Sequence, residues 1–179
     1  MNYAGFQSLT VELMDGVAHV VIDNPPINLF DLVLYPEMVR LSAELRDDED
    51  VRAVVVSSEN PEFFIAHFDV SLILQLPTGR PAPVVLSDFH QMCENFRTMP
   101  KPTICAIDGR VGGGGSEVTL SMDMRFASPR AVFSQPEVAL GILPGGSGTV
   151  RLPRLVGRSR ALEVILGSED IDAMTAEKW

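Results

Sequence analysis

Cysteine is scarce in this sequence. Cys93 and Cys105 are the only two among 179 residues, and their spacing matches no zinc-binding motif. The N-terminus also lacks a basic segment followed by an apolar core, the pattern of a secretory signal peptide. We therefore predict a cytoplasmic protein with reduced thiols and without a metal site.

Long hydrophobic runs are absent as well. A membrane-spanning helix needs about 18 to 20 consecutive apolar residues, and Asp, Glu, Arg or Pro interrupts every candidate stretch here. The sequence therefore predicts no membrane span.

Positive charge is in short supply. The chain has 14 Lys and Arg residues against 24 Asp and Glu residues, which gives a formal net charge of −10. The basic residues are scattered, whereas nucleic-acid binding needs a contiguous basic surface. This argues against a nucleic-acid partner, but a few arginines and helix ends can still hold a small anionic ligand.

What the chain does have is an ordinary globular composition, 46% hydrophobic and 21% charged. Its length is enough to bury a core and favours one domain over two. We predict a single domain over residues 1–179.

Strand and helix patterns alternate in the first third of the chain. Residues 17–23 and 51–57 have the β-branched density of buried strands. Between them, apolar residues follow the period of an amphipathic helix: Leu34, Met38, Leu41 and Leu45. A parallel pairing of the two strands across this helix would make a βαβ unit, so the predicted class is α/β.

The middle of the chain predicts further elements. Residues 63–66 form a candidate short strand, residues 77–83 a Pro-rich exposed loop, and residues 103–107 another strand. Helical spacing links five apolar residues before that strand: Val85, Phe89, Met92, Phe96 and Met99.

The last third begins with a run of four glycines, Gly112 to Gly115, from which we expect a helix through Met122. Short strands should follow around residues 125–127 and 131–133, then a turn at 143–148. Helical patterns cover residues 159–166 and 173–178. The chain stops at Trp179 just after the second pattern begins, which predicts a fragment or a partner that covers this end.

The glycine run and two carboxylates form the main candidate site. Glycines leave backbone N–H groups bare near a helix N-terminus, where an oxyanion is stabilised. Glu117 follows the run and Glu137 lies 20 positions later, so the pattern indicates acid–base chemistry beside a backbone anion site. Taken alone, the glycines would be a flexible turn and Glu117 a solvated residue at a helix start.

Four strings in register resemble the crotonase superfamily, the enoyl-CoA hydratases and isomerases. They are residues 64–70 (FIAHFDV), 101–109 (KPTICAIDG), 113–117 (GGGSE) and 133–145 (FSQPEVALGILPG). The resemblance implies a spiral of ββα units that binds an acyl-CoA in fatty acid metabolism. No separate cofactor is implied, because coenzyme A is part of the substrate.

The resemblance also implies roles for particular residues. The N–H groups of Phe68 and Gly114 would hold the thioester oxygen, Glu117 would activate a water molecule, and Glu137 would deliver a proton to the α-carbon. Abstracting or adding a proton beside a thioester carbonyl creates an enolate, which preorganised amides stabilise. An apolar pocket shared by two carboxyls would raise their pKa values.

Residues beside these four are implied in substrate binding: Ala66, His67, Asp69, Gly113 and Gly145. Two of them also have a simpler structural interpretation. His67 is more often structural than catalytic in such a loop, and Asp69 is expected mainly to cap the next helix. His67 and Phe68 replace the small residues usual in the family and would narrow the acyl pocket.

Several alternatives remain open. The runner-up activity is an isomerase that needs only Glu137, and the alternative from another class is a non-catalytic acyl-CoA-binding or assembly module. We expect the helical C-terminal portion of the family, which builds its trimer contacts, to be absent after Trp179. The resemblance implies a homotrimer or hexamer if that portion is supplied, and an apolar set could also supply an association face (Leu152, Leu155, Val156, Leu162). Candidate ligands for the coenzyme A phosphates are Arg97, Lys101 and Arg110.

Overall fold

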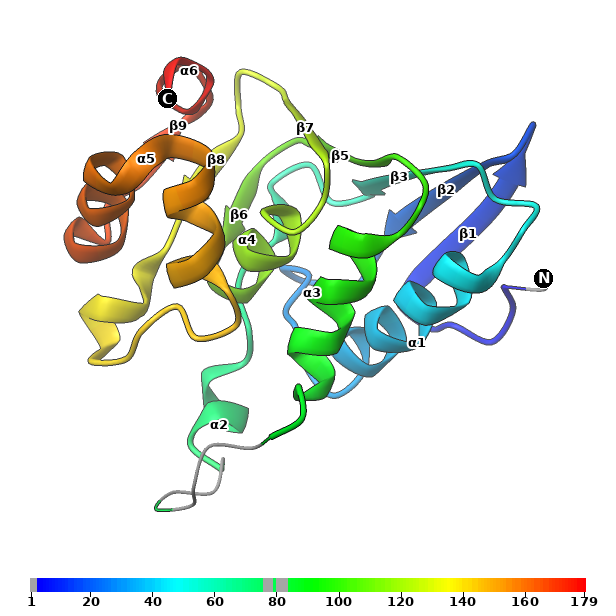
Figure 1. Cartoon of the computed structure of the whole chain (residues 1–179), viewed down its shortest axis with the longest axis horizontal. Helices are drawn as coiled ribbons and strands as arrows, with labels where there is room; N and C mark the ends of the chain where they lie inside the picture. The colour runs from blue at the N-terminus through cyan, green and yellow to red at the C-terminus, as the bar shows by residue number, and fades with distance from the viewer. Residues whose placement is uncertain (1–2, 76–78, 80–83) are drawn as a thin grey trace.

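Two β-sheets organise the chain, and the computed structural model describes residues 3–75, 79 and 84–179 (Figure 1). A five-stranded sheet has the order β1-β2-β3-β5-β7 and a four-stranded sheet the order β4-β6-β8-β9. Among the described strands, β1–β2 and β8–β9 pair antiparallel and the other pairs are parallel. The strands are β1 (Leu9–Met14), β2 (Val17–Ile22), β3 (Ala53–Ser58), β4 (Phe63–Ile65), β5 (Thr103–Ile107), β6 (Arg110–Gly112), β7 (Met124–Ala127), β8 (Val132–Ser134) and β9 (Ile171–Asp172).

Successive strands enter the two sheets in turn, which confirms a spiral of ββα units. The pairs β3 and β4, β5 and β6, and β7 and β8 each give one strand to each sheet before a helical segment follows. The helices are α1 (Leu34–Asp47), α2 (Val70–Ile73), α3 (Asp88–Thr98), α4 (Gly113–Thr119), η1 (Pro136–Leu140), α5 (Gly148–Gly167) and α6 (Ala173–Lys178). Each unit therefore brings a helix start close to the ends of neighbouring parallel strands.

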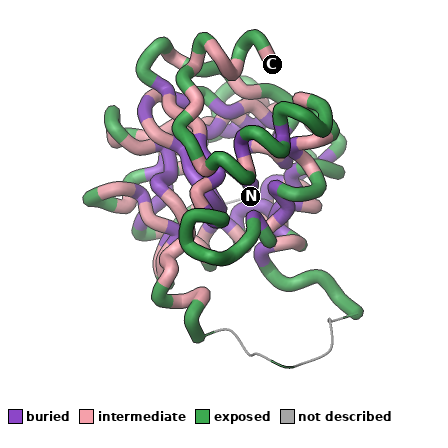
Figure 2. Tube along the Cα trace, turned by 90° about the vertical axis from the view of Figure 1, so that its left-hand side faces the viewer, coloured by how far each residue is buried: buried purple, intermediate pink, exposed green. Residues whose placement is uncertain are grey.

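The predicted βαβ unit is confirmed by β2, α1 and β3. The strands pair in parallel, with Val20 opposite Val56. The apolar stripe of α1 lies against them and is fully buried, with Leu34 and Leu41 at 0% exposure. Figure 2 shows buried residues concentrated in the interior of the molecule and exposed segments around them. Burial of one face of α1 against the sheet stabilises the β2–α1–β3 unit through the hydrophobic effect.

Two boundaries differ from the sequence prediction. Strand β1 pairs antiparallel with β2 through a turn at Asp15 and Gly16, which both have positive φ; no strand had been predicted there. The predicted helical stripe from Val85 starts too early, because α3 begins at Asp88, where the Ser87 side chain accepts the His90 N–H. Val85 lies before this cap and is 76% exposed.

Helix α4 also begins earlier and ends earlier than predicted. Three of the four glycines lie in its first turn instead of in a turn before it, and it ends at Thr119, short of Met122. The packing explains the glycines: a Cβ at Gly115 would lie 2.6 Å from the Cβ of Ile65. The helix start can therefore press directly against β4.

The C-terminal third forms a smaller apolar cluster. Leu152, Ala161 and Val164 of α5 are buried together, whereas Leu155 and Leu162 are about half exposed. Gly157, at φ 79°, kinks α5. The helices predicted at 159–166 and 173–178 are confirmed. The loop predicted at 77–83 lies outside the described residues, apart from Gly79.

Across the residues that the structure describes, no helix has the length and apolar character needed to cross a membrane. Cys93 and Cys105 are both buried free thiols.

Candidate active site

Glu117 lies on α4 and is buried, with 4% of its surface exposed. Its Oε1 accepts hydrogen bonds from two consecutive backbone N–H groups, those of Ser147 at 2.8 Å and Gly148 at 2.7 Å. Its other oxygen lies beside Gly146, where a Cβ would come within 2.4 Å of Oε2. The turn before α5 therefore wraps around this carboxylate.

The environment of Glu117 moves its titration to neutral pH. Burial raises its pKa from an ordinary value of 4.5 to about 7, the amide of Gly148 acts in the opposite direction, and the negative charge of Glu137 adds to the rise. Burial disfavours the charged form more than the hydrogen bonds favour it. A carboxyl with this pKa can both take and release a proton at physiological pH.

Glu137 approaches the same place from η1 and is 8% exposed. Its Oε1 lies 3.1 Å from where a Cβ would stand on Gly113. Burial raises its pKa, opposed by its own backbone N–H and by the charge of His67. Among the described residues, no group hydrogen-bonds its Oε2. This oxygen is placed to carry a proton or meet a ligand.

The predicted oxyanion donors are the backbone N–H groups of Phe68 and Gly114. Phe30 N–H donates to the His67 carbonyl, and Asp69 N–H donates to the Phe30 carbonyl. Because this parallel bridge uses the groups on either side of Phe68, its own N–H points the opposite way. Gly114 lies in the first turn of α4, where N–H groups have no acceptor within the helix. A Cβ at Gly114 would lie 3.1 Å from the Phe68 Cβ, so the two residues are in contact.

An aromatic wall covers this corner, and it is formed by Phe30, Tyr35, Phe68 and Phe89. Their ring centroids lie between 5.2 and 6.4 Å apart. The ring of Phe89 also lies beside Gly114 and Gly146, with a Cβ at Gly146 only 2.4 Å from its Cε1. Sequence analysis placed Phe89 in the core stripe of α3 and did not associate it with the site.

The other predicted site residues, Ala66, His67 and Asp69, differ in burial and in their contacts. Ala66 is buried, and its carbonyl lies 2.7 Å from where a Cβ would stand on Gly112. His67 is half-buried and its Nδ1 lies 2.8 Å from the Phe68 carbonyl. Asp69 caps α2 by accepting the Ser71 N–H, as expected.

Gly145 is exposed, and its carbonyl accepts a hydrogen bond from His90 Nε2 at 2.8 Å. A protonated Nε2 leaves Nδ1 of a neutral imidazole to accept from the Ser87 hydroxyl, 2.6 Å away. This contact joins the start of α3 to the turn that surrounds Glu117.

The residues that orient Glu117 could not be identified from the sequence. Ser147 and Gly148 donate the hydrogen bonds, and Arg151 in turn contacts the Ser147 side chain. Their only sequence signal is the Gly- and Pro-rich turn at 143–148, which shows where the chain bends but not what the bend encloses.

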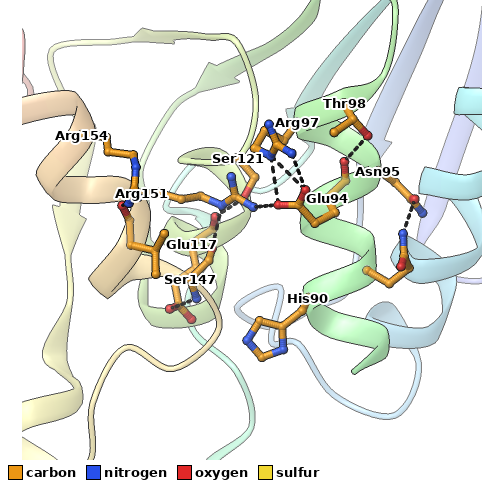
Figure 3. Close-up of polar contacts among 12 residues, drawn as sticks. His90, Glu94, Asn95, Arg97, Thr98, Glu117, Ser121, Ser147, Arg151 and Arg154 are labelled. Carbon is orange, nitrogen blue, oxygen red and sulfur yellow. Dashed lines mark hydrogen bonds and ion pairs between the residues drawn. The ribbon is translucent and has the colours of Figure 1, made fainter. Parts of the chain in front are cut away.

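The three basic residues considered for phosphate binding have protein partners. Arg97 pairs with Glu94, as Figure 3 shows, and Arg110 pairs with Asp170. Lys101 Nζ donates to the carbonyls of Leu45 and Asp48 at the end of α1. A phosphate role would compete with these contacts and stays a prediction.

Comparison with known proteins identifies the family. The model of the enoyl-CoA hydratase/isomerase family matches residues 12–179. The chain belongs to this family. A Streptomyces avermitilis protein assigned as an enoyl-CoA hydratase is 38% identical with a TM-score of 0.86, and the match covers 97% of this chain. DspI of Pseudomonas aeruginosa is 34% identical with a TM-score of 0.83 over 96% of this chain.

An enoyl-CoA hydratase of Bacillus anthracis is 28% identical, with a TM-score of 0.85 over 96% of this chain. These three matches cover 65%, 70% and 67% of the respective relatives. The chain thus spans about two thirds of the length of these family members. Within its own length the chain has two sheets, and Glu117 and Glu137 lie near the glycine-rich start of α4.

No cluster of three or more potential metal ligands is formed by His, Cys, Asp and Glu side chains within residues 3–75, 79 and 84–179. The groups that do converge are carboxyls and backbone amides. Their chemistry is proton transfer and anion stabilisation.

Proposed function

We propose that this chain catalyses hydration of a 2-enoyl-CoA thioester. The observation that carries the proposal is the meeting of two buried carboxyls, Glu117 from α4 and Glu137 from η1, beside the bare N–H groups of a helix start. The raised pKa values of both acids, from burial, support their use as proton carriers near neutral pH.

In this mechanism Glu117 takes a proton from water while the hydroxyl adds to the β-carbon. The electrons of the double bond move to the thioester oxygen, where the N–H groups of Phe68 and Gly114 hold the developing negative charge. Such donors contribute roughly 3 to 4 kcal/mol each in comparable oxyanion sites. Glu137 then gives its proton to the α-carbon, and dehydration follows the reverse path.

The test follows the conjugated absorbance of crotonyl-CoA in the wild type, Glu117→Gln and Glu137→Gln. Each variant keeps the shape of the side chain but cannot transfer the proton. We expect each to lower kcat by at least about a hundredfold, the usual contribution of a positioned acid or base. Unchanged turnover in both variants would refute the assignment.

The same proteins separate hydration from isomerisation. A 3-enoyl-CoA substrate should be converted to the conjugated 2-enoyl form by an isomerase, and that activity should survive Glu117→Gln, since only Glu137 is needed. Tight binding of a thioester by calorimetry without turnover of either substrate would instead support a binding module.

A further inference from the structure

Ser147 has a strained backbone at the point where it contacts Glu117. Its φ is 143° and its ψ is −3°, in a region that residues with a side chain rarely adopt. The residue is 8% exposed, and its N–H donates to Glu117 Oε1. Something outside the turn must hold this conformation.

Arg151, one turn further along α5, makes the contact that holds it. Its Nε donates to Ser147 Oγ at 3.0 Å, and its second guanidinium nitrogen donates to Glu94 Oε1 at 2.7 Å. The side chains of Arg151 and Glu94 are 12% and 30% exposed, so solvent screens their ion pair only in part. Figure 3 shows Arg151 between Ser147 and Glu94.

Glu94 is a firm anchor for this link. Its carboxylate also receives three hydrogen bonds from Arg97 on the same helix, at 2.6 to 3.0 Å. The hydrogen bonds of Arg97, with those of Arg151, lower the pKa of Glu94 to about 2 although burial opposes them. Glu94 therefore stays ionised, and α3 fixes the position of Arg151.

We propose that Arg151 is a positioning residue for Glu117, acting through the Ser147 hydroxyl. It keeps the strained turn closed so that the N–H groups of Ser147 and Gly148 reach the carboxylate. The link to activity rests on the proposed function, in which Glu117 is the base. Without the Arg151 contact, the turn relaxes, the N–H groups move away, and the charged form of Glu117 loses stabilisation.

Charged and titratable groups from three elements face Glu117. Glu137 comes from η1, Cys93 from α3 and Arg151 from α5. Burial raises the pKa of Cys93 to about 11, so this thiol stays neutral while Glu117 titrates. Any effect of Arg151 must therefore be separated from Glu137 and from the simple loss of a positive charge.

The experiment titrates the Glu117 carboxyl by NMR in protein with ¹³C-labelled glutamate, with its signal assigned by its absence in Glu117→Gln. Arg151→Met removes both contacts, and Ser147→Ala removes the hydroxyl without changing the net charge. We expect both to raise the pKa of Glu117 by about half a unit to one unit, because hydrogen bonds to the charged form are lost. An effect of charge alone would appear only in Arg151→Met.

Ser147→Gly provides the decisive comparison. Glycine adopts a φ near 143° without strain, so the turn should keep its shape without the tether. We expect Ser147→Gly to titrate near wild type, and Arg151→Met to have much less effect in that background than alone. Arg160→Met, which removes an exposed guanidinium of α5 that pairs with Glu163, is the matched control and should leave the Glu117 titration unchanged.

An unchanged pKa of Glu117 in Ser147→Ala would overturn the proposal. So would an Arg151→Met substitution that shifts this pKa equally in the wild-type and the Ser147→Gly backgrounds. If Arg151→Met does not fold, the Ser147 variants still decide. The titration does not depend on turnover. If the wild type shows no hydration but the variants show these pKa shifts, the proposed function is refuted and the positioning role of Arg151 stands. If hydration occurs, the acid limb of kcat/KM should move upward with the titration.

Discussion

The Glu117 carboxylate accepts the backbone N–H of Gly148 at 2.7 Å, across 31 residues of sequence. Ser147 donates to the same oxygen. Two N–H donors would by themselves hold this carboxyl ionised and its pKa low, yet burial raises the pKa to about 7. The site thus fixes the orientation of the acid through hydrogen bonds and sets its titration through desolvation.

Glu117 should make the protein less stable as the pH rises from about 4.5 to 7. In this range the folded protein keeps a proton on Glu117 that the unfolded chain has lost, so the free energy of unfolding falls with increasing pH. Glu117→Gln cannot ionise and should be more stable than wild type at pH 8 by about 3 kcal/mol. Urea unfolding at pH 4 and pH 8 measures the difference.

The control for this prediction is Glu163→Gln, a surface carboxyl paired with Arg160 on α5. It should show no comparable gain at pH 8. A Glu117→Gln protein with the same pH dependence as wild type would contradict the raised pKa.

Gly146→Ala should destabilise the protein, because the new methyl would lie 2.4 Å from both Glu117 Oε2 and the Phe89 ring. Overpacking of this kind costs about 1 to 3 kcal/mol. The neighbouring Gly145→Ala is a matched control, since its nearest contact would be an ordinary 3.4 Å. Thermal unfolding followed by circular dichroism should separate the two; equal melting temperatures would mean that the turn yields freely.

Gly115→Ala tests the packing of α4 on β4. Its methyl would lie 2.6 Å from the Ile65 Cβ and 2.8 Å from the Ile65 carbonyl oxygen, and backbone cannot move aside as a side-chain tip can. We expect a loss of about 3 kcal/mol in urea unfolding. In Gly167→Ala, at the end of α5, the nearest atom to the new methyl would be Glu169 Cγ at 3.7 Å. This variant should be neutral or slightly stabilising. Similar losses in both variants would argue against this packing.

Phe68→Ala should widen the space for the acyl chain under the proposed function. The substitution removes a ring of the aromatic wall but retains the N–H that would hold the thioester oxygen. We expect the ratio of kcat/KM for a 2-octenoyl thioester to that for a crotonyl thioester to rise about tenfold. Phe126→Ala, 63% exposed on β7, is the control, and an unchanged ratio in Phe68→Ala would place the acyl chain elsewhere.

Much of the fold could be predicted from local patterns. The stripe Leu34 to Leu45 gave helix α1 because its spacing matches one helix face, and the β-branched runs gave β2 and β3. Strand β1 was missed: five of its six residues are half-buried or exposed, and four of these are exposed. An edge strand with one pairing partner carries little of the periodicity on which such a prediction depends.

By itself, the sequence determined the α/β class, the ββα spiral through its motifs, and the two glutamates as the acids to examine. Only the tertiary structure decided which groups hold Glu117, that Phe89 lies beside it, and that Arg151 reaches Ser147 and Glu94. The physical reason is range: periodicity and turn chemistry act over a few residues, whereas Ser147 meets Glu117 across 30 residues and Arg151 meets Glu94 across 57. Their geometry exists only after both sheets have brought α3, α4 and α5 together.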